Sequence, residues 1–275
     1  MSEHMPTQQF LESLIQEAGS ITLKFFQKNF SIQEKSDNQG IVTDADIASE
    51  NFIKKKIHEK FKTHSILAEE SGLEKFNQEN TEKEQAIWII DPLDGTTNFS
   101  KGNPYYCISI AFGHIVEGIF QAKLAGICQP TTQSLFIAEK NKGAFLNKQK
   151  LALNDFQNFK LASIATGFSS NKDKELIQVV NTIGAIQNKS LGLRINGAAA
   201  LDLALTAKGI FQGFYEIPLA PWDMAAGALL VSEAGGIVSN FLGTEFCPLR
   251  DKGIIAANKQ IFPELLSIIK HHYSN

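Results

Sequence analysis

Cysteine is scarce in this 275-residue sequence, and its few copies form no recognisable site. Cys107, Cys128 and Cys247 stand in unrelated contexts, are odd in number and include no CxxC pair, so nothing indicates a zinc or redox centre. We expect reduced, mostly buried thiols. The histidines show no HExxH spacing, and the P-loop, GxGxxG and GxSxG patterns are missing. These absences argue against zinc-protease, nucleotide-loop and serine-hydrolase chemistry.

The sequence also lacks long apolar runs and an excess of positive charge. No span of about 18 uninterrupted apolar residues could form a membrane helix, and the first residues have neither the basic start nor the apolar run of a signal peptide. The net charge is -3, which leaves no basic excess to neutralise a nucleic-acid backbone. We therefore expect a soluble, cytoplasmic protein with no membrane partner and no default nucleic-acid partner.

Hydrophobic spacing predicts two helices and then a set of strands in the first half of the chain. Apolar residues recur at steps of three and four in two segments, namely Phe10, Leu14, Ala18, Ile21 and Phe25, then Ile53, Ile57 and Phe61. The polar stretch KSDNQG at 35–40 predicts a loop between them. The short apolar runs SILA and AIWII end in Glu69 and Asp91, which is typical of strands that deliver carboxylates to one sheet edge. Residues 105–127 and 134–147 alternate and turn at glycines like antiparallel strands.

The second half alternates between strand and helix signals. We predict strands at 161–166 and 211–216, with helices at 172–184 and 198–209. A further helix begins at Pro221 and stops at Gly235 and Gly236, and a final one runs from Phe262 to about His271. The chain then divides into an N-terminal α+β lobe, residues 1–150, which carries most of the acids, and a closely packed C-terminal α/β lobe, residues 151–275.

Acidic residues stand where these elements are predicted to end: Asp44, Asp46, Glu69, Glu70, Asp91, Asp94 and Asp223. Magnesium prefers hard oxygen ligands, so carboxylates from separate segments suit it. In DPLDGTT, the Pro92 turn would let Asp91, Asp94 and the intervening carbonyl face one point. Gly95 permits close backbone approach, and the threonines after it offer donors to a phosphate. Each acid alone is equally typical of a helix cap or a solvated loop, and only their combination predicts a site.

Four segments resemble the inositol monophosphatase family, in the family's order and with similar spacing. They are VTDAD at 42–46, LAEESG at 67–72, WIIDPLDGTTNF at 88–99 and PWDMAAGALLVSEAGG at 221–236. Weaker similarity in KGAFLNKQKL and RINGAAALDLA extends the likeness over most of the chain. The resemblance implies an α+β, layered αβαβα sugar-phosphatase fold, with a large antiparallel β-rich lobe, a smaller α/β lobe and the site between them.

The resemblance also implies roles for individual residues. The metal-binding positions, for two or three Mg²⁺ ions, are Glu69, Asp91, the carbonyl of Leu93, Asp94 and Asp223. The catalytic positions are Asp46, Glu69 and Thr96, of which Asp46 and Thr96 orient and deprotonate the attacking water. The substrate-binding positions are Gly95, Thr96, Gly197, Ala198, Ala199 and Glu216. Lys35 matches a loop lysine of the family that holds a metal water, and a solvated lysine is the alternative.

The expected activity is Mg²⁺-dependent hydrolysis of a phosphate monoester, with inositol 1-phosphate as the first candidate, by in-line attack of water. By resemblance we also expect lithium sensitivity and a homodimer. The DGTT segment is shared with relatives that act on fructose 1,6-bisphosphate, adenosine 3′,5′-bisphosphate, histidinol phosphate or NADP, so these remain alternatives. Glu216 and GAAALDLA favour the inositol branch. At Ala198 several family members carry threonine, so the preferred polyol stays open.

Two other interpretations were weighed. An Asp-x-Asp phosphatase would use Asp44 as a nucleophile, but the run QGIVT before it is too short and weak for the strand that this mechanism requires. Some bacterial relatives bind the transcription machinery, so a protein-interaction role is the other alternative. Because all the metal-binding acids are present, loss of catalysis is not indicated, and a binding role alongside catalysis remains open.

Overall fold

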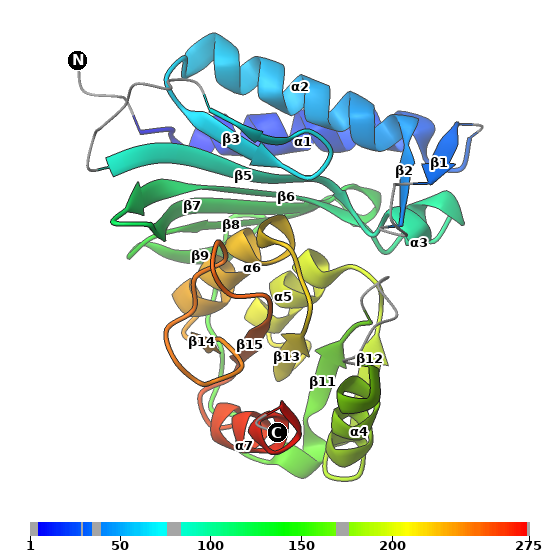
Figure 1. Cartoon of the computed structure of the whole chain (residues 1–275), viewed down its shortest axis with the longest axis vertical. Coiled ribbons are helices and arrows are strands. Elements are labelled where there is room, and N and C mark those ends of the chain that lie inside the picture. Colours follow the sequence, from blue (N-terminus) through cyan, green and yellow to red (C-terminus); the bar gives the residue numbers. More distant parts are fainter. Residues whose placement is uncertain (1–4, 29, 35–39, 76–83, 169–175, 274–275) are drawn as a thin grey trace.

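The helices and strands are stacked in five layers, in the order helix, sheet, helix, sheet, helix (Figure 1). The structure is a computed structural model, and it describes residues 5–28, 30–34, 40–75, 84–168 and 176–273. In Figure 1 the helices α1 (Gln8–Phe25) and α2 (Asp44–Lys60) lie above the large sheet, and α5 (Ala199–Ala207) and α6 (Pro221–Glu233) fill the space between the sheets. The predicted α+β, αβαβα architecture is confirmed.

The large sheet has eight strands within the described residues, in the order β10-β9-β8-β7-β6-β5-β3-β4. They are β3 (Ser65–Ala68), β4 (Gly72–Glu74), β5 (Glu84–Asp94), β6 (Cys107–Val116), β7 (Ile119–Gln129), β8 (Ser134–Glu139), β9 (Gly143–Leu146) and β10 (Gln149–Leu151). Neighbouring strands are antiparallel except β3 and β5, which are parallel, with Ala68 opposite Ile90. Since parallel strands end at the same sheet edge, Glu69 and Asp91 emerge side by side, as the sequence predicted.

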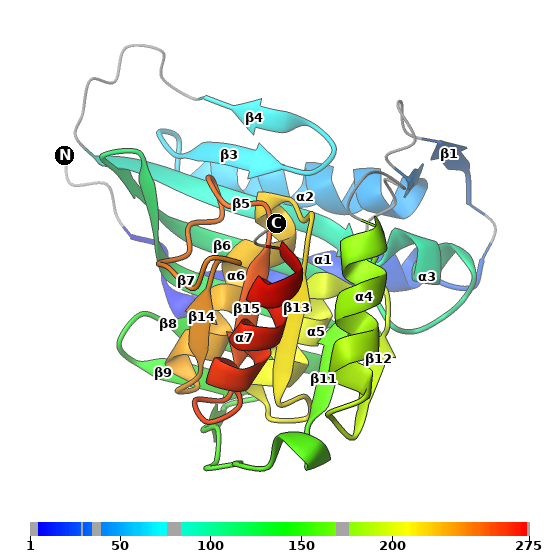
Figure 2. The same ribbon diagram turned by 60° about the horizontal axis from the view of Figure 1, so that its bottom comes forward.

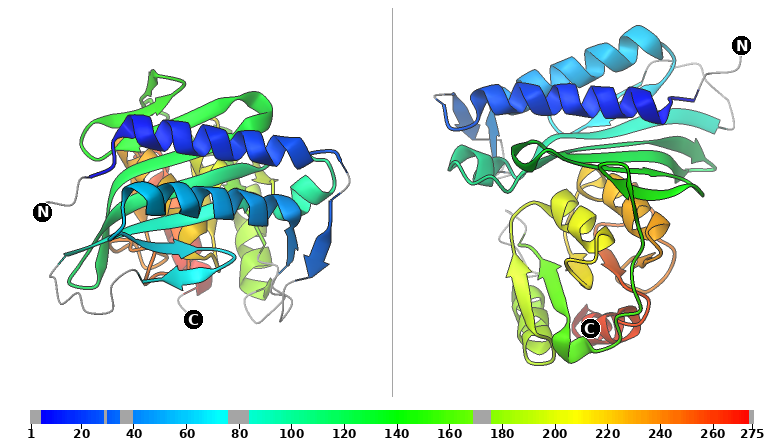
Figure 3. Two further views of the ribbon diagram at one scale, coloured as in Figure 1. Left: turned by 90° about the horizontal axis from the view of Figure 1, so that it is seen from above. Right: turned by 180° about the vertical axis from the view of Figure 1, so that it is seen from behind.

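The apolar run AIWII is continuous because both faces of β5 are covered. Trp88 and Ile90 pack with α1 and α2, whereas Ile87 and Ile89 face the layer that contains α5 and α6. Figure 3 shows α1 and α2 lying across the outer face of this sheet. A buried apolar side chain of this size contributes roughly 1.5–3 kcal/mol, so this strand anchors the two layers on either side of it.

The buried face of α2 is as predicted, and that of α1 is shifted. Ile53 and Ile57 are fully buried on α2. On α1, Leu14 and Ala18 are buried as expected, but the centre of the face is formed by Leu11, Ile15 and Thr22, and the three aromatic or branched residues predicted at its ends are half-buried. The shift arises because α1 contacts both the sheet and α2, which buries a wider stripe than a single partner would.

A short hairpin precedes α2. It consists of β1 (Ile32–Glu34) and β2 (Ile41–Thr43), which pair antiparallel. The predicted loop at 35–40 and the candidate Lys35 lie outside the described residues, apart from Gly40. The hairpin was not predicted, because its strands are three residues long and β1 is fully exposed.

The smaller sheet is mixed, and its order among the described residues is β12-β11-β13-β15-β14. Its strands are β11 (Ser163–Thr166), β12 (Gly192–Ile195), β13 (Gly213–Glu216), β14 (Ile237–Ser239) and β15 (Ile254–Ala257). The first three are parallel, and the last two are antiparallel to their neighbours. Figure 2 shows α4 (Leu176–Gln187) and α7 (Phe262–Tyr273) over the outer face of this sheet.

The layer between the sheets is closely packed. A side chain at Gly227 on α6 would place its Cβ only 2.4 Å from the Cβ of Leu203 on α5, so glycine permits the approach of the two helices. Pro221 occupies the first turn of α6, and Gly235 with φ +94° follows its end, as predicted. All three cysteines are free and buried, as expected. No helix in the part of the chain that the structure describes is long and apolar enough to cross a membrane.

Candidate metal and phosphate site

Three of the predicted acids converge in one place. One carboxylate oxygen from each of Asp91, Asp94 and Asp223 lies within 4.8 Å of the other two. Asp91 and Asp94 end β5 and are buried, with 1% and 8% of their surface exposed, while Asp223 lies in the first turn of α6. Two segments that are about 130 residues apart in the sequence therefore form one cluster of negative charge.

A bulge in β5 brings the first two acids together. In a regular strand, residues three apart point to opposite faces. Here the pairing with β6 shifts between Asp91 and Asp94, so that three steps on β5 match two on β6. Two hydrogen bonds hold the bulge: Leu93 N donates to Asp91 Oδ1 at 3.0 Å, and Ser49 Oγ of α2 donates to the Pro92 carbonyl at 2.9 Å. Because Pro92 has no backbone N–H, the bulge leaves no donor of this residue unpaired.

Backbone donors fix one oxygen of each of two acids and orient the carboxylates. Asp94 Oδ2 accepts from the amides of Ala200 and Leu201 at the start of α5, at 2.8 and 3.4 Å. Asp223 Oδ2 accepts from Ala220 N at 2.7 Å, which is the helix-cap interaction that was the alternative interpretation of this residue. Asp223 therefore caps the start of α6 and also has a carboxylate oxygen in the acid cluster.

The cluster is electrostatically unfavourable without a cation. Burial raises the pKa of Asp94 to about 6, although amide hydrogen bonds from α5 lower it. Burial also raises the pKa of Asp91 well above its ordinary value, and the neighbouring charges of Glu69, Asp94 and Asp223 raise it further. A divalent cation would relieve both effects. The donors are all hard oxygens, which fits Mg²⁺ and would not suit a soft metal.

Glu69 and the Leu93 carbonyl border the cluster. Glu69 follows β3, and its amide donates to the Ile90 carbonyl at 3.2 Å, which fixes it beside Asp91. The charge of Glu69 and its hydrogen bond to Asp91 both raise the pKa of Asp91. The Leu93 carbonyl lies 3.1 Å from Thr96 Oγ1. The backbone amide of the next residue, Glu70, donates to the buried Glu50 carboxylate at 2.9 Å.

Asp46 joins α2 to the phosphate segment. Its Oδ2 accepts from the amide and the hydroxyl of Thr43, which completes a capping box at the start of α2. Its Oδ1 accepts from Thr96 Oγ1 at 3.0 Å, and the Leu93 carbonyl competes for the same proton. Burial raises the pKa of Asp46 to about 6, despite these hydrogen bonds. Sequence reasoning treated a helix cap and a catalytic acid as alternatives; Oδ2 makes the cap, and Oδ1 is bound to Thr96.

Gly95 and Thr96 begin a short helix, α3 (Thr96–Ser100). Gly95 has φ +93°, a left-handed conformation that favours glycine, and a Cβ there would lie 3.0 Å from the Tyr105 carbonyl and 3.2 Å from Ala198 Cβ. The predicted substrate residues Gly197, Ala198 and Ala199 therefore adjoin the predicted phosphate turn. Both alanines are buried, with 3% and 7% exposed.

Glu216 lies at the end of β13, and 8% of its surface is exposed. Burial raises its pKa well above the ordinary value, and the charges of Asp223, Asp202 and Asp94 raise it further. Sequence reasoning missed Gly167, which leaves the space that the Glu216 carboxylate occupies: a Cβ at Gly167 would lie 2.4 Å from both Glu216 carboxylate oxygens. A glycine directly after the predicted strand LASIAT was the available signal.

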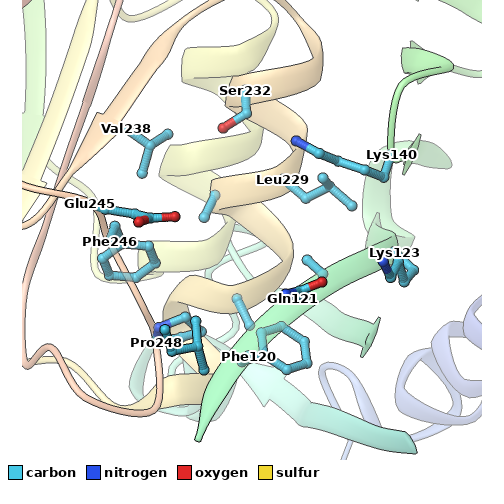
Figure 4. Close-up of a pocket in the computed structure, with 14 residues that line it drawn as sticks. Phe120, Gln121, Lys123, Lys140, Leu229, Ser232, Val238, Glu245, Phe246 and Pro248 are labelled. Atoms are coloured by element: carbon cyan, nitrogen blue, oxygen red, sulfur yellow. The ribbon is translucent and has the colours of Figure 1, made fainter. Parts of the chain in front are cut away.

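Sequence reasoning also missed three polar residues behind the site, Asn98, Tyr105 and Asp202, which are hydrogen-bonded around the phosphate turn. A separate pocket of about 440 Å³ lies along α6 between β7 and residues 245–248 (Figure 4). Lys123, Lys140, Glu245 and Phe120 are among the residues that line it. None of the candidate site residues line it. The acid cluster and this pocket are therefore separate features of the molecule.

The layered fold is shared with a family of phosphatases. The chain belongs to the inositol monophosphatase family, whose model matches residues 4–274. It is 39% identical over 246 residues to the Nus factor SuhB of Pseudomonas aeruginosa, and the match covers 88% of this chain and 87% of that protein.

Two solved structures share the fold. The extragenic suppressor protein suhB of Bartonella henselae is 31% identical, with a TM-score of 0.86 over 95% of this chain and 97% of that chain. An inositol monophosphatase of Thermotoga maritima is 28% identical, with a TM-score of 0.84 over 97% of both chains. A structure named suhB and a structure named inositol monophosphatase thus both match nearly the whole chain.

Proposed function

We propose that this protein is a Mg²⁺-dependent phosphomonoesterase that hydrolyses inositol 1-phosphate to inositol and phosphate. The observation that carries the proposal is the approach of Asp91, Asp94 and Asp223 to within 4.8 Å, beside the hydrogen-bonded pair of Asp46 and Thr96. Hard oxygen donors and a candidate proton acceptor lie together, which is the equipment that phosphoryl transfer to water requires. Membership of the family supports the same reaction class.

The candidate ligands for two or three Mg²⁺ ions are Glu69, Asp91, the Leu93 carbonyl, Asp94 and Asp223. Magnesium bound there would lower the pKa of a coordinated water and neutralise charge on the phosphate and the leaving oxygen. The protein's own contribution is to hold these oxygens in place through the β5 bulge and the two helix starts. Such preorganisation avoids reorganisation during the reaction.

The Thr96 hydroxyl orients the nucleophile through its own hydrogen bond. Thr96 Oγ1 donates its proton to Asp46 Oδ1, 3.0 Å away. The lone pairs of Thr96 Oγ1 are then available to accept a proton from the attacking water. As Thr96 Oγ1 takes the proton of the water, the threonine's own proton passes to Asp46 Oδ1. The Asp46 pKa of about 6 leaves this acceptor ionised at neutral pH. The amides of Gly95 and Thr96 are the proposed donors to the phosphate.

The alcohol half of the substrate would lie between residues 197–199 and Glu216. Ala198 and Ala199 give this side of the site a small apolar wall, and the Glu216 carboxylate supplies the acceptor for polyol hydroxyls. Because Ala198 offers no hydroxyl, selection among polyols would depend mainly on Glu216. This predicts a polyol phosphatase with broader tolerance at the position that faces Ala198.

A phosphate-release screen tests the proposal. The purified protein is assayed with Mg²⁺ and with EDTA on inositol 1-phosphate, fructose 1,6-bisphosphate, adenosine 3′,5′-bisphosphate, histidinol phosphate and NADP, and substrates are ranked by kcat/KM. The proposal expects release with Mg²⁺ alone, highest for inositol 1-phosphate. A higher rank for one of the other compounds would leave the reaction class in place and replace the substrate. No release from any of them would overturn the proposal.

A second function is favoured by the Pseudomonas relative, which is named a Nus factor. We propose a transcription-related binding role alongside catalysis, and its test is pull-down of transcription proteins with wild type and Asp94→Asn. Capture that is unchanged in the variant would support a role that does not use the acid cluster. Failure of both forms to retain any transcription protein would contradict it.

The homodimer proposal rests on one apolar surface. α4 contains no charged residue, and its Ile177 and Val180 are 72% and 51% exposed. It contacts the edge strand β12, which ends at Ile195, 49% exposed, and is preceded by Leu191, 64% exposed. An uncharged apolar face beside an open strand edge is a surface that a second copy would cover.

A further inference from the structure

Four residues behind the phosphate turn form a closed ring of hydrogen bonds through their side chains and two backbone carbonyls. The Tyr105 hydroxyl and Asn196 Nδ2 both donate to Asp202 Oδ1, the latter at 2.7 Å. Asn98 Nδ2 donates at 2.8 Å to the carbonyls of both Tyr105 and Asn196. Each member is thus linked to its two neighbours, and the ring joins residues that are about a hundred positions apart.

The ring connects the parts of the site that would hold the two halves of the substrate. Asn98 lies in α3 two residues after Thr96, and the Tyr105 carbonyl lies against Gly95. Asn196 directly precedes the candidate substrate residues at 197–199. Asp202 lies in α5, whose first amides hold Asp94. A shift in any member would therefore change the distance between the phosphate turn and the alcohol side.

Burying the Asp202 carboxylate costs desolvation free energy, so packing alone does not explain this residue. Only 1% of its surface is exposed, and burial raises its pKa to about 7, although hydrogen bonds from Tyr105 and Asn196 lower it. An apolar residue of similar volume would avoid this desolvation cost. Its benefit lies in geometry, because a single carboxylate oxygen fixes two donors from separate segments at once.

We propose that Asp202 and Tyr105 are positioning residues that set the spacing between the phosphate turn at Gly95 and Thr96 and the alcohol-binding residues 197–199. Neither would touch the reacting atoms. The inference rests on the proposed phosphatase function and adds a specificity determinant to it: the ring matters for a substrate held at both ends and little for one held by its phosphate alone. A displacement of about 1 Å at a reacting centre can cost about a hundredfold in rate.

The test compares two substrates. Asp202→Leu removes the acceptor for both donors, whereas Asp202→Asn keeps Oδ1 for them. For the polyol phosphate that ranks first in the screen, Asp202→Leu is expected to lower kcat/KM about 10- to 100-fold. For p-nitrophenyl phosphate, whose aryl group offers no hydroxyls to residues 197–199, the expected loss is under about threefold. Asp202→Asn is expected to restore most of the polyol activity.

A tyrosine pair provides the matched control, should Asp202→Leu fail to fold. Tyr105→Phe removes one hydroxyl from the ring and is expected to show the same substrate-selective loss, at about tenfold. Tyr106→Phe makes the same change at the adjacent buried tyrosine, outside the ring, and is expected to stay within about twofold of wild type for both substrates. Equal losses on both substrates, or equal behaviour of the two tyrosine variants, would overturn the proposal.

Hydrogen exchange separates failure of this proposal from failure of the proposed function. Amides at 196–201 are expected to exchange at least about tenfold faster in Asp202→Leu and Tyr105→Phe, and unchanged in Asp202→Asn and Tyr106→Phe. If wild type hydrolyses no phosphate ester, the proposed function fails, and this comparison still decides whether the ring holds the loop. Unchanged exchange in all four variants would refute the ring's role.

Discussion

The substitution Asp46→Asn should reduce activity and increase stability. The side chain is fully buried, and its pKa is raised from 3.8 to about 6 because burial disfavours the charged form. One pKa step is worth about 1.4 kcal/mol, so ionised Asp46 costs about 3 kcal/mol at neutral pH. Because the folded-state pKa lies above the unfolded one, this cost is absent below about pH 4 and fully present above about pH 6.

The variant keeps the helix cap and loses the proton acceptor. The amide oxygen can replace Oδ2 and accept from Thr43 N, which leaves NH₂ facing Thr96 Oγ1. The threonine proton must then turn to the Leu93 carbonyl, 3.1 Å away. Loss of general-base assistance costs about 10²- to 10⁴-fold in rate, so kcat should fall by that factor while the protein stays folded.

Two assays measure these effects. Phosphate release gives kcat, and denaturant unfolding in EDTA, followed by tryptophan fluorescence, gives the free energy of unfolding at several pH values. The difference in that free energy between Asp46→Asn and wild type should increase by about 3 kcal/mol between pH 4 and pH 7. A difference that is flat with pH, or a variant that retains more than a tenth of kcat, would refute the reasoning.

Asp44→Asn is the matched control, because Asp44 lies in the same first turn and its Oδ2 accepts from Ser31 N instead of facing Thr96. Its activity should stay within about threefold of wild type. A phosphoaspartate trapped at Asp44, together with loss of activity in this variant, would instead support the Asp-x-Asp mechanism.

Two further predictions concern the alcohol side and the apolar surface. Gly167→Ala should raise KM for the polyol substrate about tenfold in a steady-state assay, because the added Cβ would lie 2.4 Å from the Glu216 carboxylate oxygens and displace them. Gly184→Ala is the control: a Cβ there meets no atom within 4 Å, so KM should not change. Ile177→Glu should convert a dimer to a monomer in light scattering with kcat retained, because it places a charge on the most exposed large apolar residue of α4. An unchanged mass would place the interface elsewhere.

Local sequence signals predicted most of the framework. The runs SILA and AIWII were correctly predicted as strands that end in acids, because a strand covered on both faces reads as an unbroken apolar run. Pro221 and the paired glycines fixed both ends of α6. The strands β12, β14 and β15 were not predicted. Two of them, β12 and β14, are short and mostly exposed or half-buried, so no apolar run marks them.

The geometry of the site depended on contacts that have no local signature. The bulge at Pro92 and Leu93 becomes visible only through the pairing of β5 with β6. The hydrogen bond between Tyr105 and Asp202 spans 97 positions, and Gly167 is required only because Glu216 lies against it. By contrast, the threonine and acid of VTDAD form the capping box that their spacing predicts, and tertiary packing then gives Asp46 its second partner.

The acid cluster as a magnesium site for phosphate-ester hydrolysis is tested most directly by Asp94→Asn, assayed for phosphate release from inositol 1-phosphate across a Mg²⁺ titration. The amide oxygen can still accept from Ala200 N, so the variant should fold normally and lose more than about a hundredfold in kcat/KM. Glu84→Gln makes the same change at the far, exposed end of β5 and should behave as wild type. Normal Mg²⁺-dependent release by Asp94→Asn would contradict the account.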